Sequence, residues 1–301
     1  RLTMNIEVYQ RKSDDLLFPL PVPTSTGYRS YDANIGGMQN TGIDVEANIV
    51  VVDKGKFRWT TDINLSHYKN EITKMPGDQP TIIIGTKQLK VGHSIYDFFT
   101  YKYAGTNPTT GAPMWYTTNA STGEVTTTET YSSASRYYTG TSAIPDLSGG
   151  MTNTWKYGDF DLSVLVTFQT GGQIYDGSYQ GLMGQTLGTN FHKDMLKRWT
   201  STNTTSQIPV LRTNQNANGT SDRFLISSDY FSIRNVTLGY TLPKSLASAI
   251  RVSSARLAVN VTNLHTFTAR KGLDPQQSFD GTTDNAYTPL RTSTISLTMN
   301  F

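Results

Sequence analysis

The sequence predicts an all-β protein whose long antiparallel strands cross a lipid bilayer as part of a barrel. Three observations indicate this fold class. Apolar and polar residues alternate in eight segments, the connections between the segments are alternately long and short, and aromatic residues gather beside the short connections. Alternation with a period of two is typical of a strand with one apolar and one polar face. Short periplasmic turns and long outer loops are typical of outer-membrane barrels.

The composition fits strands better than membrane helices. Charged residues make up 16% of the 301 residues, against roughly 25% in ordinary soluble domains. No apolar run approaches the roughly 20 residues that a membrane helix needs. The 26 Lys and Arg residues are scattered and nearly balanced by 23 Asp and Glu residues, so no nucleic-acid partner is indicated. The absence of cysteine excludes disulfides and thiolate chemistry.

Most of the eight segments match the length of about 9–11 residues with which a tilted strand crosses a bilayer. They are residues 2–9, 43–51, 57–67, 147–157, 160–168, 230–241, 256–261 and 290–301. Tight turns at residues 53–55 and 158–159 join two pairs of segments into long hairpins. Within the sixth segment the apolar phase slips between Ile233 and Val236, which predicts a β-bulge.

The last segment shows the two faces most clearly. We expect its apolar residues to face lipid and its polar residues to face the lumen. The lipid-facing set is Ile295, Leu297, Met299 and Phe301, and the lumen-facing set is Thr294, Ser296, Thr298 and Asn300. By the same alternation we expect a further polar set to form the lumen wall: Asp44, Glu46, Arg58, Asp62, Asn64, Lys156 and Asp161.

The long connections are predicted to be extracellular loops at about residues 11–39, 70–143, 171–228 and 265–289. One short helix is expected at residues 191–199, and a linker of about ten residues around Pro243 is expected on the short side.

Aromatic residues beside the short turns predict an interfacial girdle at the periplasmic rim. Its members are Phe57, Trp59, Trp155, Tyr157, Phe160, Tyr240 and Phe301. We expect Phe301 to lie level with Trp59 and Trp155. The alternative is that aromatic residues simply flank hairpin turns.

An open sheet edge is not viable in lipid, because unpaired backbone groups find no water there. Eight strands can close by themselves. The sequence begins inside an alternating segment, however, and its loops are long for a small barrel. We therefore expect the C-terminal part of a larger barrel, in which the closing partner of the last strand lies outside this chain.

Several distinctive motifs occur in order along the chain. They are NTGIDVE at 40–46, VGHS at 91–94 with YKYAG at 101–105 and NPTTG at 107–111, IPDLSGG at 144–150, GLDP at 272–275, PLR at 289–291 and the terminal Phe301. The most recognisable stretch is DYFSIRNVTLGYTLP at residues 229–243. Together these motifs resemble the SusC/RagA-type TonB-dependent outer-membrane transporters of Bacteroidetes.

The resemblance implies a barrel of about 22 strands with a plugged lumen. It also implies a SusD-like lipoprotein partner and energy supplied by the TonB complex. The plug and the N-terminal half are absent from this sequence, so we expect them elsewhere, and no gating or TonB-contacting residue is assigned.

Enzymatic activity is not predicted. The four His residues lack metal-ligand spacing, the Gly-Gly pairs do not open phosphate-binding helices, and no Ser-His-Asp arrangement has a motif context. We predict no metal site, catalytic residue or cofactor. Asp14 with Asp15, or Asp280 with Asp284, could touch calcium, but solvated loop carboxylates are the favoured interpretation.

The long loops carry aromatic residues that could stack on sugar or peptide substrates, or instead pack inside the folded loops or against a partner. They are Tyr96, Phe98, Phe99, Tyr101, Tyr103, Trp115 and Tyr116. Two functions remain open. One is import of a glycan or oligopeptide across the bacterial outer membrane, and the other is that of an extracellular β-rich adhesin or carbohydrate-binding module.

Overall fold

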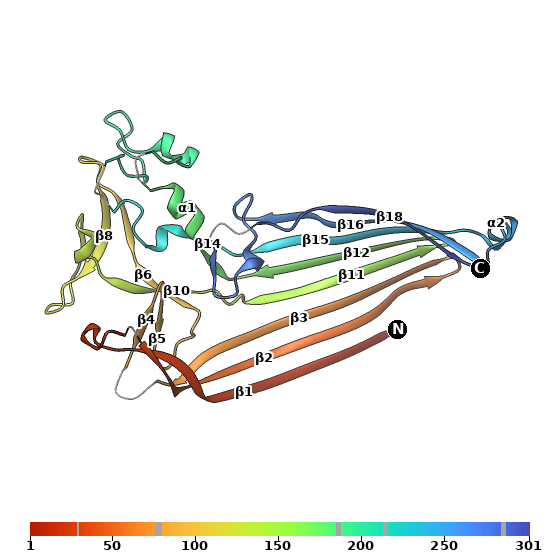
Figure 1. The fold of residues 1–301 in the computed structure, drawn as a ribbon, viewed down its shortest axis with the longest axis horizontal. Coiled ribbons are helices and arrows are strands. Elements are labelled where there is room, and N and C mark those ends of the chain that lie inside the picture. The colour runs from red at the N-terminus through yellow and green to blue at the C-terminus, as the bar shows by residue number, and fades with distance from the viewer. Residues whose placement is uncertain (29, 76–79, 185–187, 213–215, 284–286) are drawn as a thin grey trace.

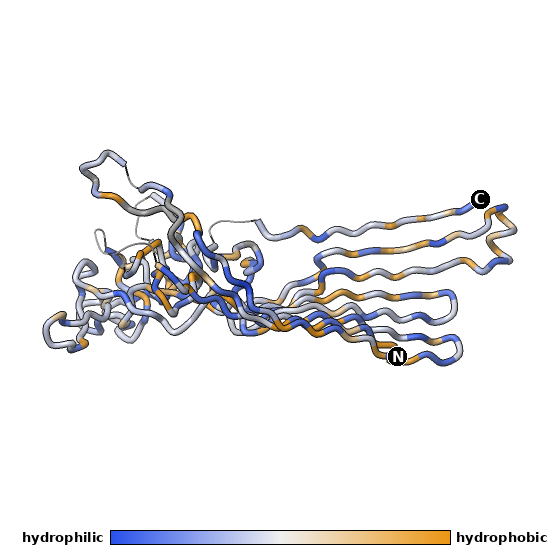
Figure 2. Tube along the Cα trace, turned by 90° about the horizontal axis from the view of Figure 1, so that it is seen from below, coloured by the Kyte–Doolittle hydropathy of each residue, from blue (hydrophilic) through white to orange (hydrophobic). Residues whose placement is uncertain are grey.

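The computed structural model describes residues 1–28, 30–75, 80–184, 188–212, 216–283 and 287–301. It consists of a long, curved β-sheet and a body of short strands and helices at one end of that sheet (Figure 1). The hydropathy of the chain alternates along the strands of the sheet, as expected for strands with two different faces (Figure 2).

Eight strands form the long sheet, and every neighbouring pair is antiparallel, which confirms the predicted all-β fold. In spatial order they are β1 (Leu2–Pro21), β2 (Ser30–Lys54), β3 (Phe57–Lys74), β11 (Leu147–Tyr157), β12 (Phe160–Thr170), β15 (Tyr230–Thr241), β16 (Ser254–Thr268) and β18 (Thr292–Asn300). The spatial order follows the chain order, so the long sheet is an up-and-down meander.

The short connections lie together at one end of the sheet and the long connections at the other (Figure 1). Gly55 and Gly158 stand in the two tightest turns with φ of 61° and 58°. This left-handed conformation is accessible to glycine at little cost and is required by the hairpin turns of most favourable twist. The predicted separation of the connections between the two ends of the sheet is therefore present. Their lengths do not alternate throughout, however, because the connection from β1 to β2 (residues 22–29) is shorter than the connection from β15 to β16 (residues 242–253).

The prediction of a loop at residues 11–39 is wrong for most of that range. β1 and β2 remain paired from Leu2 with Ile49 as far as Pro21 with Ser30. The register of the pairing shifts around Asp15, which has φ of 54°, and the two strands stay paired on both sides of this point. Two prolines are compatible with β1 because it is an edge strand of the sheet.

The β-bulge predicted in the sixth segment is confirmed. The pairing of β12 with β15 passes from Leu165 with Asn235 directly to Val166 with Ile233. Arg234 is the extra residue, and the pairing of β15 with β16 shifts at the same place. Because of this extra residue, the apolar residues on both sides of the bulge, such as Ile233 and Val236, point to the same face of the sheet.

The helices are short. α1 spans Gly177–Leu182, and α2 spans Lys244–Ala249 within the connection that was predicted to be a linker. The helix expected at residues 191–199 is a 3-10 helix, η3 (Lys193–Lys197). The other 3-10 helices are η1 (Thr24–Thr26), η2 (Tyr131–Ser133), η4 (Asp222–Phe224) and η5 (Pro275–Gln277). Among the described residues, no helix has the length and apolar character to cross a membrane.

The three longest connections fold together into one body, here called the loop body (residues 75–146, 171–229 and 269–291). It contains three small sheets. The first is β4 (Ile82–Ile84), β5 (Lys87–Leu89), β6 (Asp97–Tyr101) and β10 (Arg136–Ser142). The second is β7 (Tyr103–Thr106), β8 (Pro113–Thr118) and β9 (Val125–Thr128). The third is β13 (Gln173–Asp176), β14 (Leu225–Ser227) and β17 (Thr282–Thr283).

The loop body has its own apolar core. Phe98 from the first connection packs with residues of the second, including Met195 and Phe224. The third connection joins through β17, which runs parallel to β13. A half-buried ion pair ties the second and third connections, because Arg270 Nε lies 2.7 Å from Oδ2 of the buried Asp176. The long loops are therefore packed against one another rather than independent.

Replacing Phe98 with alanine tests this core. Phe98 is fully buried, and removing a buried phenylalanine ring costs about 3–5 kcal/mol. We expect Phe98→Ala to make the loop body sensitive to limited proteolysis while the long sheet stays protected. The matched control is Leu196→Ala, because Leu196 is 82% exposed. Equal protease resistance of the two variants would contradict a shared core.

Candidate functional site

The long sheet has one continuous apolar face. Side chains of directly paired residues in antiparallel strands point to the same side, so the pairing assigns the faces. One row runs from Trp59 through Trp155 and Leu162 to Leu238, Val259 and Ile295. Leu297 and Met299 share this face, two and four residues further along β18. Many of its side chains are exposed, including Ile295 at 75%.

Aromatic residues occupy two adjacent rows of the apolar face, near the short turns. The pairing aligns Phe57, Tyr157, Phe160 and Tyr240 in one row. Trp59 and Trp155 stand in the next row, with their ring centroids 6.1 Å apart, and the rings of Phe160 and Tyr240 are 4.6 Å apart.

Phe301 is not aligned with the two tryptophans. Along the hydrogen-bonded rows, Ile295 is the residue of β18 level with Trp155, so Phe301 lies six residues further toward the end with the short turns (295 to 301). Rows perpendicular to tilted strands run obliquely across a barrel, so a common height of Phe301 and the two tryptophans at the membrane rim stays a prediction.

The opposite face of the sheet is polar. The pairing places all seven predicted lumen-wall residues on it: Asp44, Glu46, Arg58, Asp62, Asn64, Lys156 and Asp161. Most of its carboxylates lie on β1, β2 and β3, where Glu7 pairs with Asp44, and Glu46 lies two residues further along β2. Asp44 accepts a hydrogen bond of 2.5 Å from the hydroxyl of Ser66. This face therefore suits water and polar groups rather than lipid.

An ion pair crosses one strand of the polar face. Arg256 on β16 reaches Asp161 on β12, with 2.7 Å between Nη2 and Oδ2. The strand between them, β15, carries Gly239 at the crossing point, and a Cβ atom there would collide with the guanidinium. The glycine therefore leaves room for the arginine to pass over β15 in this position. The alternation in the sequence did not reveal this pair.

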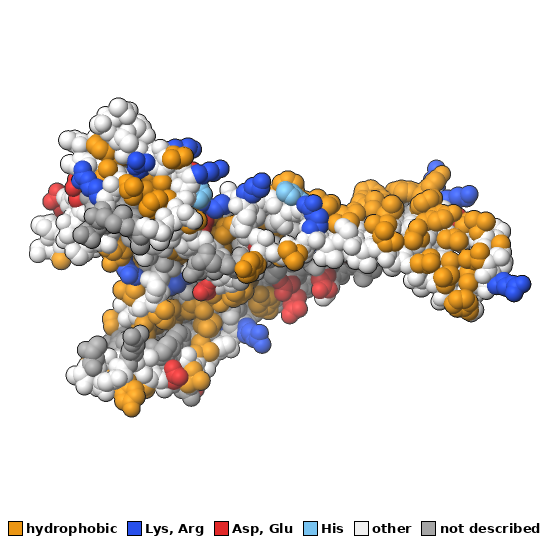
Figure 3. All heavy atoms as spheres, turned by 45° about the horizontal axis from the view of Figure 1, so that its top comes forward, with side chains coloured by type: hydrophobic (Ala, Val, Ile, Leu, Met, Phe, Trp, Pro, Cys, Tyr) orange, Lys and Arg blue, Asp and Glu red, His pale blue; other side chains and the backbone are white. Residues whose placement is uncertain are grey.

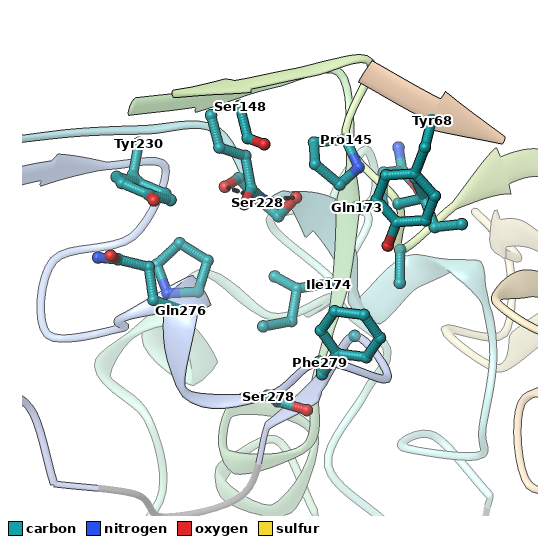
Figure 4. A pocket seen from close by; sticks show the side chains of 15 residues that line it. Tyr68, Pro145, Ser148, Gln173, Ile174, Ser228, Tyr230, Gln276, Ser278 and Phe279 are labelled. Carbon is teal, nitrogen blue, oxygen red and sulfur yellow. Dashed lines mark hydrogen bonds between the residues drawn. The ribbon is translucent and has the colours of Figure 1, made fainter. Parts of the chain in front are cut away.

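A cavity of about 320 Å³ lies where the polar face meets the loop body (Figure 4). Ser148 and Tyr230 come from the sheet, Gln173 from the second connection, and Gln276 and Phe279 from the third. None of its fifteen lining residues is charged. The walls thus offer aromatic rings, amides and hydroxyls to a neutral ligand. These residues come from distant segments, so no local motif in the sequence indicated them.

The predicted substrate-contacting aromatics have different environments, and none of the seven lines this cavity. Phe98 and Trp115 are buried, at 0% and 1% exposure, so for these two the packing alternative holds. Trp115 meets the rings of Tyr103 and Tyr131 edge-on, with centroids 6.4 and 5.0 Å apart.

The remaining five aromatics are half-buried. The guanidinium of Arg136 lies 4.9 Å from the ring centroid of Tyr101. Arg223 packs over Tyr103 and Lys102 over Tyr116, while Phe99 packs against Tyr138. Tyr96 contacts a residue of the cavity, since its ring meets Phe279 edge-on at 5.3 Å.

The described residues contain no group of three or more His, Cys, Asp or Glu residues that could hold a metal ion. Asp284, one of the carboxylates considered for calcium, lies outside the described residues.

Comparison with known proteins shows which proteins this chain is similar to. No family model matches the chain, but curated relatives do. The TonB-dependent receptor P3 of Formosa agariphila is 28% identical over 335 residues, covering 100% of this chain and 32% of that receptor. Over its whole length, this chain is similar to TonB-dependent receptors. SusC of Bacteroides thetaiotaomicron, also a TonB-dependent receptor, is 24% identical across 100% of the chain and 30% of its own length.

The fold comparison agrees. A chain of the RagAB peptide transporter superposes with a TM-score of 0.88 at 24% identity, covering 100% of this chain and 34% of that one. The structure of the RagAB peptide importer in the "open-open" state superposes on this chain with a TM-score of 0.82. The resemblance to SusC/RagA-type TonB-dependent transporters is therefore confirmed. The chain spans about a third of the length of the receptors that it matches.

Within this receptor-like chain, the loop body contains a lysine in an unusual environment. Lys87 Nζ donates a 2.5 Å hydrogen bond to the carbonyl of Tyr96 and lies 3.2 Å from the ring centroid of Phe98. Burial lowers the pKa of Lys87 to about 7, although the carboxylates of Asp280 and Asp97 oppose the shift. Its ammonium group is therefore charged in only part of the physiological pH range.

The shift predicts how the loop body responds to pH. Between about pH 7 and 10.5 the unfolded chain keeps a proton on Lys87 that the folded chain releases, so stability rises with pH in this window. We expect wild-type protein to resist proteolysis of the loop body better at the upper part of this window, and Lys87→Met to flatten the dependence. Lys90→Met, at an exposed position, is the control. An unchanged slope in Lys87→Met would disprove this origin.

Proposed function

We propose that this chain forms part of an outer-membrane transporter that imports large nutrients, glycans or oligopeptides, by TonB-dependent uptake. The single observation that carries the proposal is the two-faced eight-stranded sheet, with its short turns at one end and the loop body at the other (Figure 1). The similarity to TonB-dependent receptors along the whole chain supports it.

The apolar face supports contact with lipid. Soluble proteins rarely expose contiguous apolar patches larger than a few hundred Å². Here Leu2, Met4 and Ile6 on β1 are 52–60% exposed, and Ile295 and Leu297 on β18 are 75% and 57% exposed. In a bilayer these side chains meet acyl chains, and the aromatic rows beside the short turns form the periplasmic girdle.

The hydrogen-bonding of the sheet edges supports a larger assembly. β1 and β18 each have one neighbour within the long sheet, so each leaves a free edge. Lipid offers no partner for those backbone groups. We infer that further strands of the same transporter pair with both edges, and that its plug faces the polar side of this sheet.

The loop body and the cavity support a role at the outer surface. We infer that a SusD-like lipoprotein covers the loop body. The cavity opens between that body and the polar face of the long sheet (Figure 4). Aromatic rings and amides suit the faces of sugar rings and the amide groups of peptides alike. Among the loop aromatics, Tyr96, Phe99, Tyr101, Tyr103 and Tyr116 remain candidates for contact with substrate or partner.

An extracellular adhesin or carbohydrate-binding module is the second candidate. Such a module would be soluble without detergent and would bind glycan by itself. The exposed apolar face disfavours this candidate, because in a soluble module the apolar side chains of eight strands would contact water, which is unfavourable.

Uptake by intact cells tests the transporter. We expect cells that express the whole polypeptide to accumulate a fluorescent oligosaccharide or oligopeptide, and to lose that accumulation when TonB is deleted. The polypeptide should require detergent and co-purify with a surface lipoprotein. A protein that stays monomeric and soluble without detergent would refute the proposal.

Charges placed on adjacent residues of β18 test the two faces. A lysine on the lipid face of a barrel costs about 2–4 kcal/mol near the bilayer midplane, whereas the lumen face tolerates it. We expect Ile295→Lys to lower the yield of folded protein in the outer membrane, measured by heat-modifiable mobility in gels, and Thr294→Lys to leave it unchanged. The opposite ranking would mean that the faces are assigned the wrong way round.

A further inference from the structure

The connection between β15 and β16 carries a helix, α2, at the end of the sheet that otherwise has only tight turns. The helix follows Pro243 and ends in a Schellman motif. The N–H of Arg251 donates to the carbonyl of Ser248 at 3.0 Å, and the N–H of Val252 donates to the carbonyl of Ala247 at 3.1 Å. The helix is therefore a defined element with fixed side-chain directions.

α2 packs against the apolar face of the long sheet. Ala247 forms a small core with Val252 and Ala255, and Leu242 packs against it. Ala255 pairs with Met299 and therefore points to the apolar side, yet it is only 2% exposed because α2 covers it. The helix thus lies outside the sheet, on the face proposed to meet lipid, and not on the lumen side.

The side chains of α2 separate into two groups. Successive residues of a helix turn by about 100°, which puts Leu246 and Ile250 on one side and Lys244, Ser245 and Ser248 on the other. Leu246 and Ile250 are each 54% exposed, although both are large and apolar. Figure 3 shows hydrophobic side chains gathered at this end of the molecule, with basic side chains at the margin of the patch.

Two basic residues flank the exposed apolar pair. Lys244 begins the helix and Arg251 follows its end, and both side chains are exposed. Neither forms an ion pair within the described part of the chain. Arg251 has φ of 62° at a position where glycine is usual, so the chain keeps a cation there despite the backbone strain.

We propose that α2 is an interfacial anchor for anionic phospholipid in the leaflet at the short-turn end. Leu246 and Ile250 enter the boundary between headgroups and acyl chains, and Lys244 and Arg251 contact the phosphates. The proposal rests on the membrane location proposed above. It adds a lipid-binding site with named residues in the connection between β15 and β16, where a tight turn would be enough to join the two strands.

Lipid fits this surface better than a protein partner. The surface continues the apolar face without a break, its margin is basic, and interfacial helices combine an apolar side with Lys and Arg on the polar side. A stable protein interface buries roughly 800 Å² on each partner, far more than two side chains of a six-residue helix offer.

Depth-dependent quenching tests the position of α2 in the whole transporter, reconstituted in nanodiscs of phosphatidylethanolamine and phosphatidylglycerol. The chain contains no cysteine, so Leu246→Cys, Ser248→Cys and Ile295→Cys can each carry an environment-sensitive fluorophore. The quenchers are a lipid with a nitroxide high on its acyl chain and aqueous iodide. Ser248→Cys is the matched control on the polar side of α2, and Ile295→Cys reports the apolar face of the sheet.

We expect the lipid nitroxide to quench the label at 246 about twofold more than the label at 248, and iodide to show the reverse. A label at 246 that iodide quenches, or that neither reagent quenches, would overturn the proposal in favour of solvent or a covering protein. If the label at 295 escapes this nitroxide and also a nitroxide placed near the end of the acyl chain, the membrane location itself fails. A quenched label at 295 beside an unquenched label at 246 overturns the anchor alone.

Lipid retention tests the two cations. Each basic residue near an anionic surface contributes about 1 kcal/mol, or about a fivefold preference for anionic lipid. We expect Lys244→Gln with Arg251→Gln to lose retained phosphatidylglycerol, relative to phosphatidylethanolamine, in native mass spectra. Lys193→Gln with Lys197→Gln in the loop body is the control. Equal retention by both double variants would overturn phosphate contact.

Discussion

The backbone hydrogen bonds between neighbouring strands are the constraint on which the rest of the structure depends. Eight antiparallel strands satisfy one another from β1 to β18, and this continuous pairing fixes which side chains share a face. A shift of one residue would move Trp59 or Ile295 to the polar side. The bulge at Arg234 shows the constraint at work, because one extra residue in β15 brings Ile233 back onto the apolar face.

The two ends of the sheet differ in how the chain connects its strands. At the short-turn end the chain reverses in two residues at Gly55 and Gly158, and only α2 adds further structure. At the other end the long connections bury their own apolar residues around Phe98 and Phe224. A packed body can hold a defined surface for a partner or substrate, whereas separate flexible loops would lose more entropy on binding.

Much of the sheet could be predicted from the sequence. Alternation identified all eight strands, the slip near Ile233 identified the bulge, and the seven residues predicted to form the lumen wall lie together on one face. The boundaries of β1 and β2 were underestimated, because backbone pairing continued through residues that read as turns. The cavity could not be predicted, since Tyr68, Tyr230 and Phe279 come from separate segments and carry no common motif.

The sequence by itself determined the two faces of this protein, because a strand's side chains alternate whatever its neighbours are. Only the tertiary structure decided what those faces meet locally. It buried Phe98 and Trp115 in the loop body, brought Arg256 across Gly239 to Asp161, and laid α2 over Ala255. Each of these contacts joins residues from different elements, and its geometry exists only once the strands have paired and the long connections have folded together.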